Sequence, residues 1–450
     1  MPDNKPKPSK HPNVIWVFGD QHRAQALGCA GDPNVYTPNI DRMASEGLSL
    51  NGVGGCPLCC PYRGSLLTSR YPHEMIPGHE YPIPDDAKTL AHPFNDAGYH
   101  TAYIGKWHVD GHHEREGRGA LAYVKPHRRG GFKQWLGFEN NNSQWDSFVH
   151  GHDDQGNEIE HYRLPTYETD ALTDLTLDYI KERKEDDKPF FCVMSVQPPH
   201  NPYVAPEAFQ GRHTPGDIKF RPNVPDVKRI REQAGRDLAG YYGMIENLDH
   251  NLGRIFSTLW DLEMIEDTHV IFFSDHGDMH GSQGQFLKTN PYEESLRVPM
   301  IFGGTNPRYG TKNGQNAALV NHVDMAPTTL GLCNIDVPDW MRGTDYSALR
   351  VMGKEPRDDY PDSAFCQLVV PTKHGNSTDR PWRGVVTTDG WKYVCLEHQP
   401  WLLFNLNEDP YEQINLAHNS SFGKKRRELQ DKLEQWIKDT GDEFPLPQDI

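Results

Sequence analysis

The segment Cys59-Cys60-Pro61-Tyr62-Arg63 carries residues suited to chemistry on an anion. Pro61 can stand in the first turn of a helix, which puts both cysteines at the helix N-terminus. Free backbone N–H groups and the helix dipole there favour a bound anion and lower the pKa of a thiol. Arg63 lies one turn further along and can reach back to the same place. The segment therefore predicts a reactive thiol beside an anion.

The same cysteines allow other interpretations. Cys56 and Cys59 are spaced as C-x-x-C, which is also typical of a redox pair or of half a zinc site. Cys is among the residue types most often buried, so purely structural cysteines are a third interpretation. The spacing alone does not separate these alternatives from an anion site.

Polar groups that could join this chemistry follow the apolar runs predicted to be strands. They are Asp20-Gln21, Lys106 with His108, His200, and Asp275-His276. In open α/β sheets, ligands bind beyond the carboxyl ends of the strands. One polar strand end is ordinary, but four together indicate a metal-centred anion site.

The metal ligands expected at this site are Asp20, Gln21, Asp275 and His276. Carboxylate and amide oxygens suit Ca²⁺ or Mg²⁺, and the imidazole also allows Mn²⁺. Each of these residues alone is a common turn residue after a strand. The prediction of a metal rests on their combination.

The elements that must position these groups alternate along the chain. Strands are predicted at 13–18, 101–104, 190–196 and 270–273, with helices from Pro38 to about Gly47, at 171–184 and at 231–263. Alternating strands and helices predict an α/β fold with a mostly parallel sheet covered by helices on both faces. Residues 110–165 lack periodicity and are expected to form a lid or a disordered loop. Their Gly-, His- and Arg-rich part, His112 to Arg129, is a candidate pocket edge.

The pattern changes near residue 345. Short strands are predicted at 383–388, 391–396 and 401–406, with Asp389-Gly390 as a hairpin turn between the first two. A last amphipathic helix carries Leu429 and Leu433 and stops at Gly441. We therefore expect a tail at 1–12, a catalytic α/β domain at 13–345, and an antiparallel C-terminal subdomain at 346–450.

The composition argues against several classes of protein. The 450 residues carry a formal net charge of −17, which argues against a general nucleic-acid binder. No apolar run approaches the length of a membrane span, and eight cysteines are no disulfide framework. The polar N-terminus has no signal-peptide pattern, so the sequence as written predicts a cytoplasmic protein, or a periplasmic or secreted one if a leader has been removed.

Taken in order, these motifs resemble the type I sulfatases, a family of the alkaline-phosphatase-like superfamily. The maturation signature of that family, C-x-P-x-R, is similar to the segment that begins at Cys59 and continues to Leu67-Thr68-Ser69-Arg70. The other motifs in the family's order are Asn13–Gln21, Gly105-Lys106-Trp107-His108, Pro199-His200, Ser274–Asp278 and Lys288. The resemblance spans residues 12 to 345, and the C-terminal hairpins resemble the family's small subdomain.

The resemblance implies that a formylglycine-generating enzyme oxidises Cys59 to formylglycine. One hydroxyl of the hydrated aldehyde attacks sulfur, displaces the alcohol and leaves a sulfated hemiacetal. Loss of a proton from the other hydroxyl then expels sulfate and regenerates the aldehyde.

The resemblance also assigns the remaining roles. The metal, with Ca²⁺ expected first, lowers the pKa of the attacking hydroxyl. The cations that hold the charge on the sulfate oxygens are Arg63, Lys106 and Lys288. His108 contacts the formylglycine hydroxyl and helps to remove its proton, and His200, with Lys288 as a second candidate, protonates the leaving oxygen.

The sequence departs from the family pattern at four positions. Gln21 replaces a common Asp, His276 replaces a common Asn, and Tyr62 stands where Ser or Ala is usual. Cys60 adds a second thiol beside the first. Only Cys59 has Pro two residues later and Arg four residues later, so it remains the predicted nucleophile.

The motifs and the resemblance leave three alternative functions. Hydrolysis of a sulfate ester, on a sulfated saccharide or a small molecule, is the first. A phosphonate monoester or phosphodiester hydrolase is the second, because relatives with the same nucleophile also use an Asp-Gln metal pair. An inactive, anion-binding relative is the third.

Overall fold

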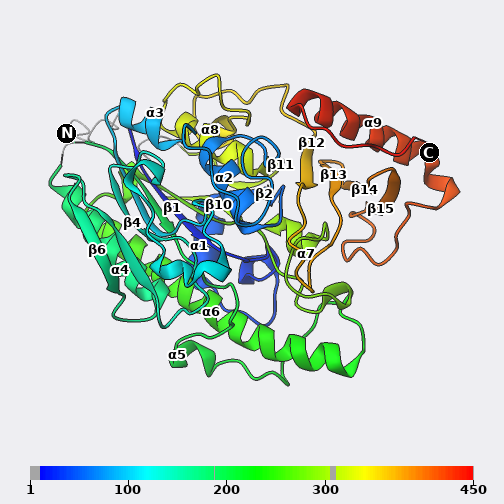
Figure 1. The fold of residues 1–450 in the computed structure, drawn as a ribbon, viewed down its shortest axis with the longest axis horizontal. Helices are drawn as coiled ribbons and strands as arrows, with labels where there is room; N and C mark the ends of the chain where they lie inside the picture. The colour runs from blue at the N-terminus through cyan, green and yellow to red at the C-terminus, as the bar shows by residue number, and fades with distance from the viewer. Residues whose placement is uncertain (1–10, 187, 305–310, 449–450) are drawn as a thin grey trace, which may run out of the picture.

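The computed structural model describes residues 11–186, 188–304 and 311–448. All but the last two residues of the predicted tail 1–12 lie outside the described residues. The described strands form two sheets, which lie side by side along the long axis of the molecule (Figure 1).

The larger sheet is mixed, with the order β11-β2-β10-β8-β1-β7-β3-β4-β5-β6 and β9 paired to β2. Its strands are β1 (Asn13–Gly19), β2 (Leu48–Val53), β3 (His100–Lys106), β4 (Gln134–Phe138), β5 (Phe148–His152), β6 (Glu158–Arg163), β7 (Phe190–Ser195), β8 (Thr268–Ser274), β9 (Arg297–Val298), β10 (Met300–Gly303) and β11 (Gly314–Asn321). The central run β8-β1-β7-β3-β4 is parallel, as predicted, whereas β10, β5 and β6 pair antiparallel with their neighbours. The carboxyl ends of the parallel strands meet at one edge.

Helices cover both faces of this sheet (Figure 1). The α-helices described before the smaller sheet are α1 (Pro38–Glu46), α2 (Cys59–Thr68), α3 (Ala91–Asp96), α4 (Glu168–Lys184), α5 (Glu207–Gln210), α6 (Lys228–Asp261), α7 (Glu293–Leu296) and α8 (Met325–Leu332), of which α5 packs on α6. In the described part of the chain, no helix has the length and apolar character needed to cross a membrane.

The packing of β1 on both faces of the sheet explains why its sequence from Val14 to Phe18 is apolar. Alternate side chains point to opposite faces of a strand. Ile15 and Val17 therefore join the core formed with α4 and α6, whereas Trp16 and Phe18 join the core formed with α2, α3 and α8. A strand covered on both faces reads as a continuous apolar run.

The prediction that residues 110–165 form a lid or a disordered loop is wrong. This region contributes β4, β5 and β6, which extend the sheet beyond β3. The strands are short, and β6 is mostly exposed at the sheet edge, so its sequence EIEHYR carries no apolar signal. β3 also continues past the predicted strand 101–104 and ends at Lys106.

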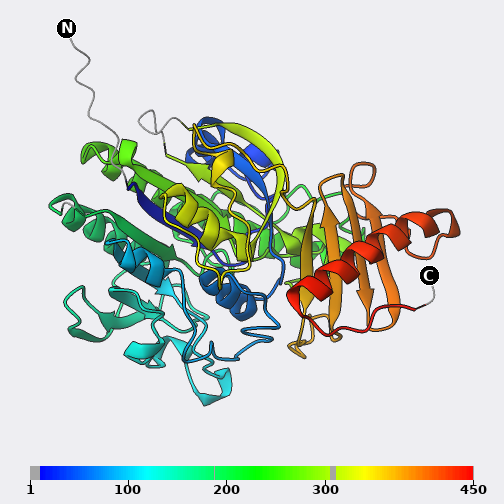
Figure 2. The same ribbon diagram turned by 90° about the horizontal axis from the view of Figure 1, so that it is seen from above.

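The smaller sheet is antiparallel and lies against the larger one (Figure 2). Its strands are β12 (Ser363–Leu368), β13 (Trp382–Thr387), β14 (Trp391–Leu396) and β15 (Gln399–Asn405), and α9 (Gly423–Thr440) packs across it. Gly441 ends α9 at φ 70°, as predicted for a C-terminal glycine. Sequence analysis missed β12, which is short and lies at the sheet edge.

The face of the smaller sheet opposite α9 shares a core with the loop before α2. Cys56 and Leu58 pack with Trp382 and other residues of β12–β15. The backbone N–H of Gln367 donates to the Gly55 carbonyl oxygen at 2.7 Å, and Trp382 Nε1 donates to the Thr289 carbonyl oxygen at 2.9 Å. The smaller sheet therefore supports two segments that carry predicted site residues.

Gly105, immediately before Lys106, is expected to tolerate no side chain. Its φ is +110°, and a Cβ would lie 2.0 Å from the Ser195 carbonyl oxygen on β7. The Gly105→Ala variant should lose about 3 kcal/mol or more of unfolding free energy, because strain and a backbone clash add. Gly98→Ala is the matched control in urea denaturation. Its φ is +85° with open space around it, so about 1 kcal/mol is expected. Equal losses in the two variants would contradict the clash.

Candidate active site

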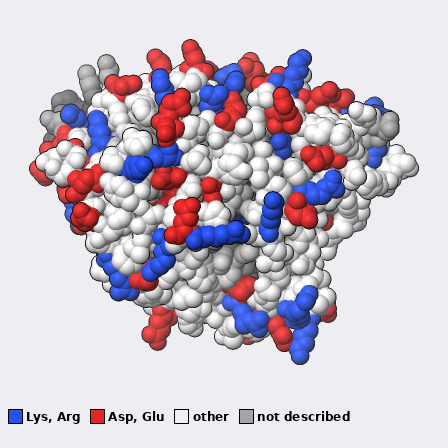
Figure 3. All heavy atoms as spheres, in the orientation of Figure 1, with Lys and Arg blue, Asp and Glu red and all other residues white. Residues whose placement is uncertain are grey.

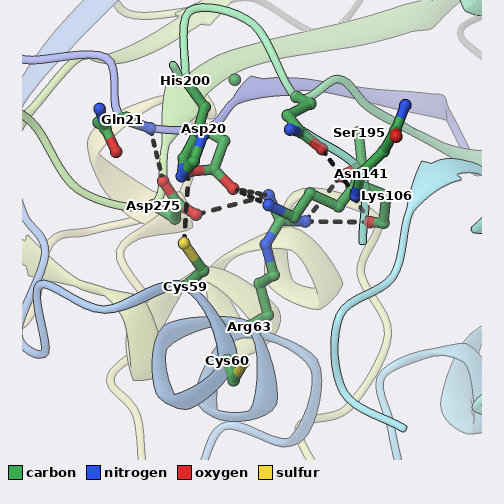
Figure 4. A network of polar contacts seen from close by, with 12 residues as sticks. Asp20, Gln21, Cys59, Cys60, Arg63, Lys106, Asn141, Ser195, His200 and Asp275 are labelled. Atoms are coloured by element: carbon green, nitrogen blue, oxygen red, sulfur yellow. Dashed lines mark hydrogen bonds and ion pairs between the residues drawn. The ribbon is translucent and has the colours of Figure 1, made fainter. Parts of the chain in front are cut away.

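Cys59 is the first residue of α2, and its sulfur is the point on which the site converges (Figure 4). Cys59 Sγ lies 3.1 Å from Lys288 Nζ, 3.2 Å from His276 Nε2 and 3.4 Å from Asp20 Oδ1. The side chain is only 2% exposed. The predicted nucleophile therefore lies among charged groups and away from bulk water.

The two carboxylates come from neighbouring strands. β1 and β8 are parallel with Gly19 opposite Ser274, so the next residues, Asp20 and Asp275, emerge together at the carboxyl edge. Asp275 Oδ1 accepts hydrogen bonds from the backbone N–H groups of Gln21 (2.9 Å) and His276 (2.8 Å). These bonds fix the orientation of the carboxylate. Its other oxygen, Oδ2, lies 3.4 Å from Arg63 Nη2.

Three cations surround the carboxylates. Lys106 Nζ lies 2.7 Å and Arg63 Nη2 3.2 Å from Asp20 Oδ2, and all three side chains are buried. Lys288 Nζ also donates to Gln21 Oε1 at 3.0 Å. Three positive charges face two carboxylates, so the site can accept a further anion.

Sequence analysis missed three residues that hold these groups. Ser195 Oγ accepts from Arg63 Nη1 and donates to the Lys106 carbonyl oxygen, both at 2.8 Å. Asp278 Oδ2 accepts from Gln21 Nε2 and from the Tyr203 hydroxyl, both at 2.5 Å. Asp278 lies within a motif already noted, but no sequence signal marks Ser195 or Tyr203.

Burial and charge have opposite effects on the pKa of Cys59. Burial raises it and Asp20 raises it further, but Lys288, His276 and Lys106 lower it, and the net pKa lies below the ordinary value of a thiol. Burial likewise raises the pKa of Asp20, yet the surrounding cations hold it well below its usual range. Asp20 is therefore a carboxylate at neutral pH.

The residues present fit a divalent metal ion. One ligand atom each from Asp20, Cys59, Asp275 and His276 lies within 4.8 Å of the others, and all four residues are buried. Asp275 Oδ2 accepts no hydrogen bond from any described residue. His276 Nδ1 faces the Gly277 carbonyl oxygen at 3.0 Å, and a neutral ring that donates from Nδ1 would present its Nε2 lone pair to the cluster.

His108 and His200 line the same site but stand apart from this cluster. Each interacts electrostatically with Lys106 and Asp20, and burial lowers the pKa of both imidazoles well below the ordinary value. His200 Nδ1 faces the Asn201 carbonyl oxygen at 2.7 Å. His108 packs edge-on against His79, with 5.5 Å between ring centroids. The structure thus brings eight of the ten predicted residues into direct contact and places these two at the margin.

The Arg-rich stretch 112–129 is occupied by internal ion pairs. Arg129 is buried and pairs with Glu158 at 2.9 Å, and Arg118 pairs with Asp146 at 2.8 Å. Arg128 pairs with Asp85 and Asp110. These pairs connect β6 with the neighbouring loops, and they already engage three of the arginines in the predicted pocket edge.

The surface charge is mixed on the face drawn in Figure 3, where Lys and Arg alternate with Asp and Glu. The residues that the structure describes form no broad basic patch on that face. Arg63 and Lys106 near Cys59 are buried, and a compact anionic group fits between such cations.

A buried thiol at a helix N-terminus, residues that could hold a metal ion, and buried cations at the carboxyl edge of an α/β sheet are typical of a hydrolase of anionic esters. Comparison with known proteins identifies the family. The sulfatase profile matches residues 12–335, and the profile of the N-sulphoglucosamine sulphohydrolase C-terminal region matches residues 281–439. This chain belongs to the sulfatase family and is a sulfuric ester hydrolase with the alkaline-phosphatase-like fold.

Individual relatives extend over nearly the whole chain. An ulvan-active sulfatase of Formosa agariphila is 33% identical over 98% of this chain and 84% of its own length. An N-acetylglucosamine-6-O-sulfatase of Bacteroides thetaiotaomicron is 25% identical over 97% of this chain and 88% of its own. The solved structure of the sulfatase-family protein YidJ of Bacteroides fragilis has a TM-score of 0.86, 25% identity, and covers 98% of both chains.

Proposed function

We propose that this sulfatase hydrolyses a sulfate ester of a saccharide, with Cys59 as formylglycine and with Ca²⁺ held by Asp20, Gln21, Asp275 and His276. The observation that carries this proposal is the convergence of Lys288, His276 and Asp20 on Cys59 Sγ. The aldehyde hydrate would supply a nucleophilic hydroxyl, and Ca²⁺ would supply positive charge beside the sulfate oxygens.

The buried cations bind and orient the sulfate group in this proposal. Arg63 and Lys106 are held by Ser195 and Asp20 and lose little freedom when the ester binds. Donors fixed in advance stabilise the charge that develops on the oxygens in the transition state. Burial of both side chains strengthens that effect by excluding water.

Lys288 is the proposed proton donor to the leaving oxygen. Burial lowers its pKa, but Cys59, Asp20 and Asp275 raise it, and the net pKa lies above the ordinary value, so the amine stays charged. In His200 the proton of the neutral ring is on Nδ1, because that nitrogen faces the Asn201 carbonyl oxygen. His200 Nε2 is then an acceptor, which suits orientation of the substrate better than donation.

All ten proposed site residues lie between positions 13 and 345. We therefore propose that 13–345 is the catalytic domain and that 346–450 is the C-terminal subdomain. Maturation would require a formylglycine-generating enzyme as a partner.

Kinetics on a set of esters test the proposed substrate. We expect the matured protein to release sulfate from ulvan oligosaccharides or from N-acetylglucosamine 6-sulfate, with a higher kcat/KM than for an aryl sulfate, because relatives carry these activities in their names. The same assay with an aryl phosphonate tests the second function, phosphonate ester hydrolysis, which the Asp-Gln metal pair also allows. Hydrolysis of the aryl sulfate alone would contradict the saccharide assignment, and a higher kcat/KM for the phosphonate would contradict the sulfatase assignment.

A further inference from the structure

A second cluster of metal-ligating side chains adjoins the site. One ligand atom each from Cys60, His79 and His108 lies within 4.8 Å of the other two. Cys60 follows Cys59 on α2, but Figure 4 shows its sulfur directed away from the polar contacts that surround Cys59. This second cluster contains no carboxylate, whereas the first is rich in oxygen ligands.

The geometry of His79 resembles that of a metal ligand with its supporting carboxylate. His79 Nδ1 lies 3.6 Å from Cys60 Sγ, while Nε2 faces Glu80 Oε1 at 3.7 Å. The two atoms are too far apart for a hydrogen bond, but a carboxylate beside the second ring nitrogen is a common support for a metal-binding imidazole.

His108 supplies an independent indication of a ligand. Its side chain is only 3% exposed, yet Nδ1 has no hydrogen-bond partner among the described residues. A buried polar atom without a partner is costly, and a bound ion is one way to satisfy it.

We propose that Cys60, His79 and His108 form a binding site for Zn²⁺, separate from the oxygen-rich site at Asp20 and Asp275, and that its occupancy inhibits the enzyme. One thiolate and two imidazoles are typical zinc ligands, with the fourth tetrahedral position left to water. Binding replaces the thiol proton of Cys60 with the ion, so each Zn²⁺ bound releases one proton. Inhibition follows because the ion engages His108, which the resemblance to sulfatases assigns to the formylglycine hydroxyl, and this part of the proposal alone rests on the proposed function.

Cobalt binding tests the site without catalysis. In a Cys59→Ala background with excess Ca²⁺, Co²⁺ should bind with one equivalent per chain and give a sulfur-to-cobalt charge-transfer band, which Zn²⁺ then removes. Calcium fills the oxygen-rich site and does not compete for a thiolate. The band should disappear in Cys60→Ser and in His79→Gln, and persist in Cys29→Ser, whose thiol is exposed elsewhere. Absence of the band, or its persistence in Cys60→Ser, would overturn the site.

Inhibition is measured separately on the matured enzyme. Zn²⁺ should inhibit sulfate release at fixed Ca²⁺, and Cys60→Ser or His79→Gln should raise the inhibitory concentration by at least about 10-fold, the scale expected for loss of a ligand. Equal sensitivity of the variants and the parent would overturn inhibition through this site. A protein that binds Co²⁺ as expected but hydrolyses no sulfate ester would contradict the proposed function and leave the site standing.

Discussion

The Cys59→Ala variant is expected to lose sulfate ester hydrolysis by a factor on the order of 10⁴ to 10⁶ in kcat, the scale at which removal of a nucleophile acts in other hydrolases. Lys288, His276 and Asp20 all lie within 3.4 Å of Cys59 Sγ, so no other described cysteine has the same surroundings. The measurement is steady-state turnover of an aryl sulfate after co-expression with a formylglycine-generating enzyme.

Cys29→Ser is the control, because Cys29 is an exposed thiol outside the site, and full activity is expected. The mass of the peptide that contains Cys59 should show the aldehyde in both the parent and the control. Retained turnover in Cys59→Ala would assign the reaction to another group. A thiol at Cys59 in an active preparation would show that catalysis does not need the aldehyde.

The Arg63→Met variant is expected to lose both stability and activity. Arg63 is buried and makes ion pairs with Asp20 at 3.2 Å and with Asp275 at 3.4 Å. Removing one partner of a buried ion pair leaves uncompensated charge and costs about 3–5 kcal/mol of unfolding free energy. Loss of a fixed donor to the sulfate oxygens should lower kcat by about 10²- to 10³-fold. Urea denaturation in the presence of a chelator, and turnover with Ca²⁺, measure the two effects.

Arg42→Met is the matched control for Arg63→Met. The Arg42 side chain is 64% exposed, and its ion pair with Glu46 spans 3.5 Å on the surface of α1. Exposed pairs of this kind contribute little, so a change within about 0.5 kcal/mol and unchanged turnover are expected. If both arginine variants unfolded at the same urea concentration, the burial argument for Arg63 would fail.

The sequence predicted the centre of the molecule better than its edges. β1, β7 and β8 are apolar throughout because both sheet faces are covered, and such runs are visible in the residues themselves. β6 escaped detection because it is mostly exposed at the sheet edge and needs no apolar run. β12 is buried, but the polar residues Ser363 and Gln367 leave it only a short apolar run. The polar groups at the strand ends could also be found in the sequence, because each of them ends an apolar run.

The residues that position the site could not be found in this way. Tyr203 and Ser195 act through hydrogen bonds to residues such as Asp278 and Arg63, and the chain brings these partners together only in three dimensions. His79 is similar, because its relation to Cys60 depends on the turn through Glu80. Sequence spacing carries no information on such contacts unless the partners share one helix or strand.

The contacts of the smaller sheet with the residues beside Cys59 and Lys288 couple the order of the site to the folding of that sheet. Gln367 holds Gly55, and Trp382 holds Thr289, across more than 90 residues of sequence in each case. Opening of the smaller sheet would therefore release the segments beside Cys59 and Lys288 together, and the free energy of that opening would limit the fraction of molecules with an ordered site. A chain shortened to its first 345 residues would keep all ten proposed site residues and lose the support that orders them.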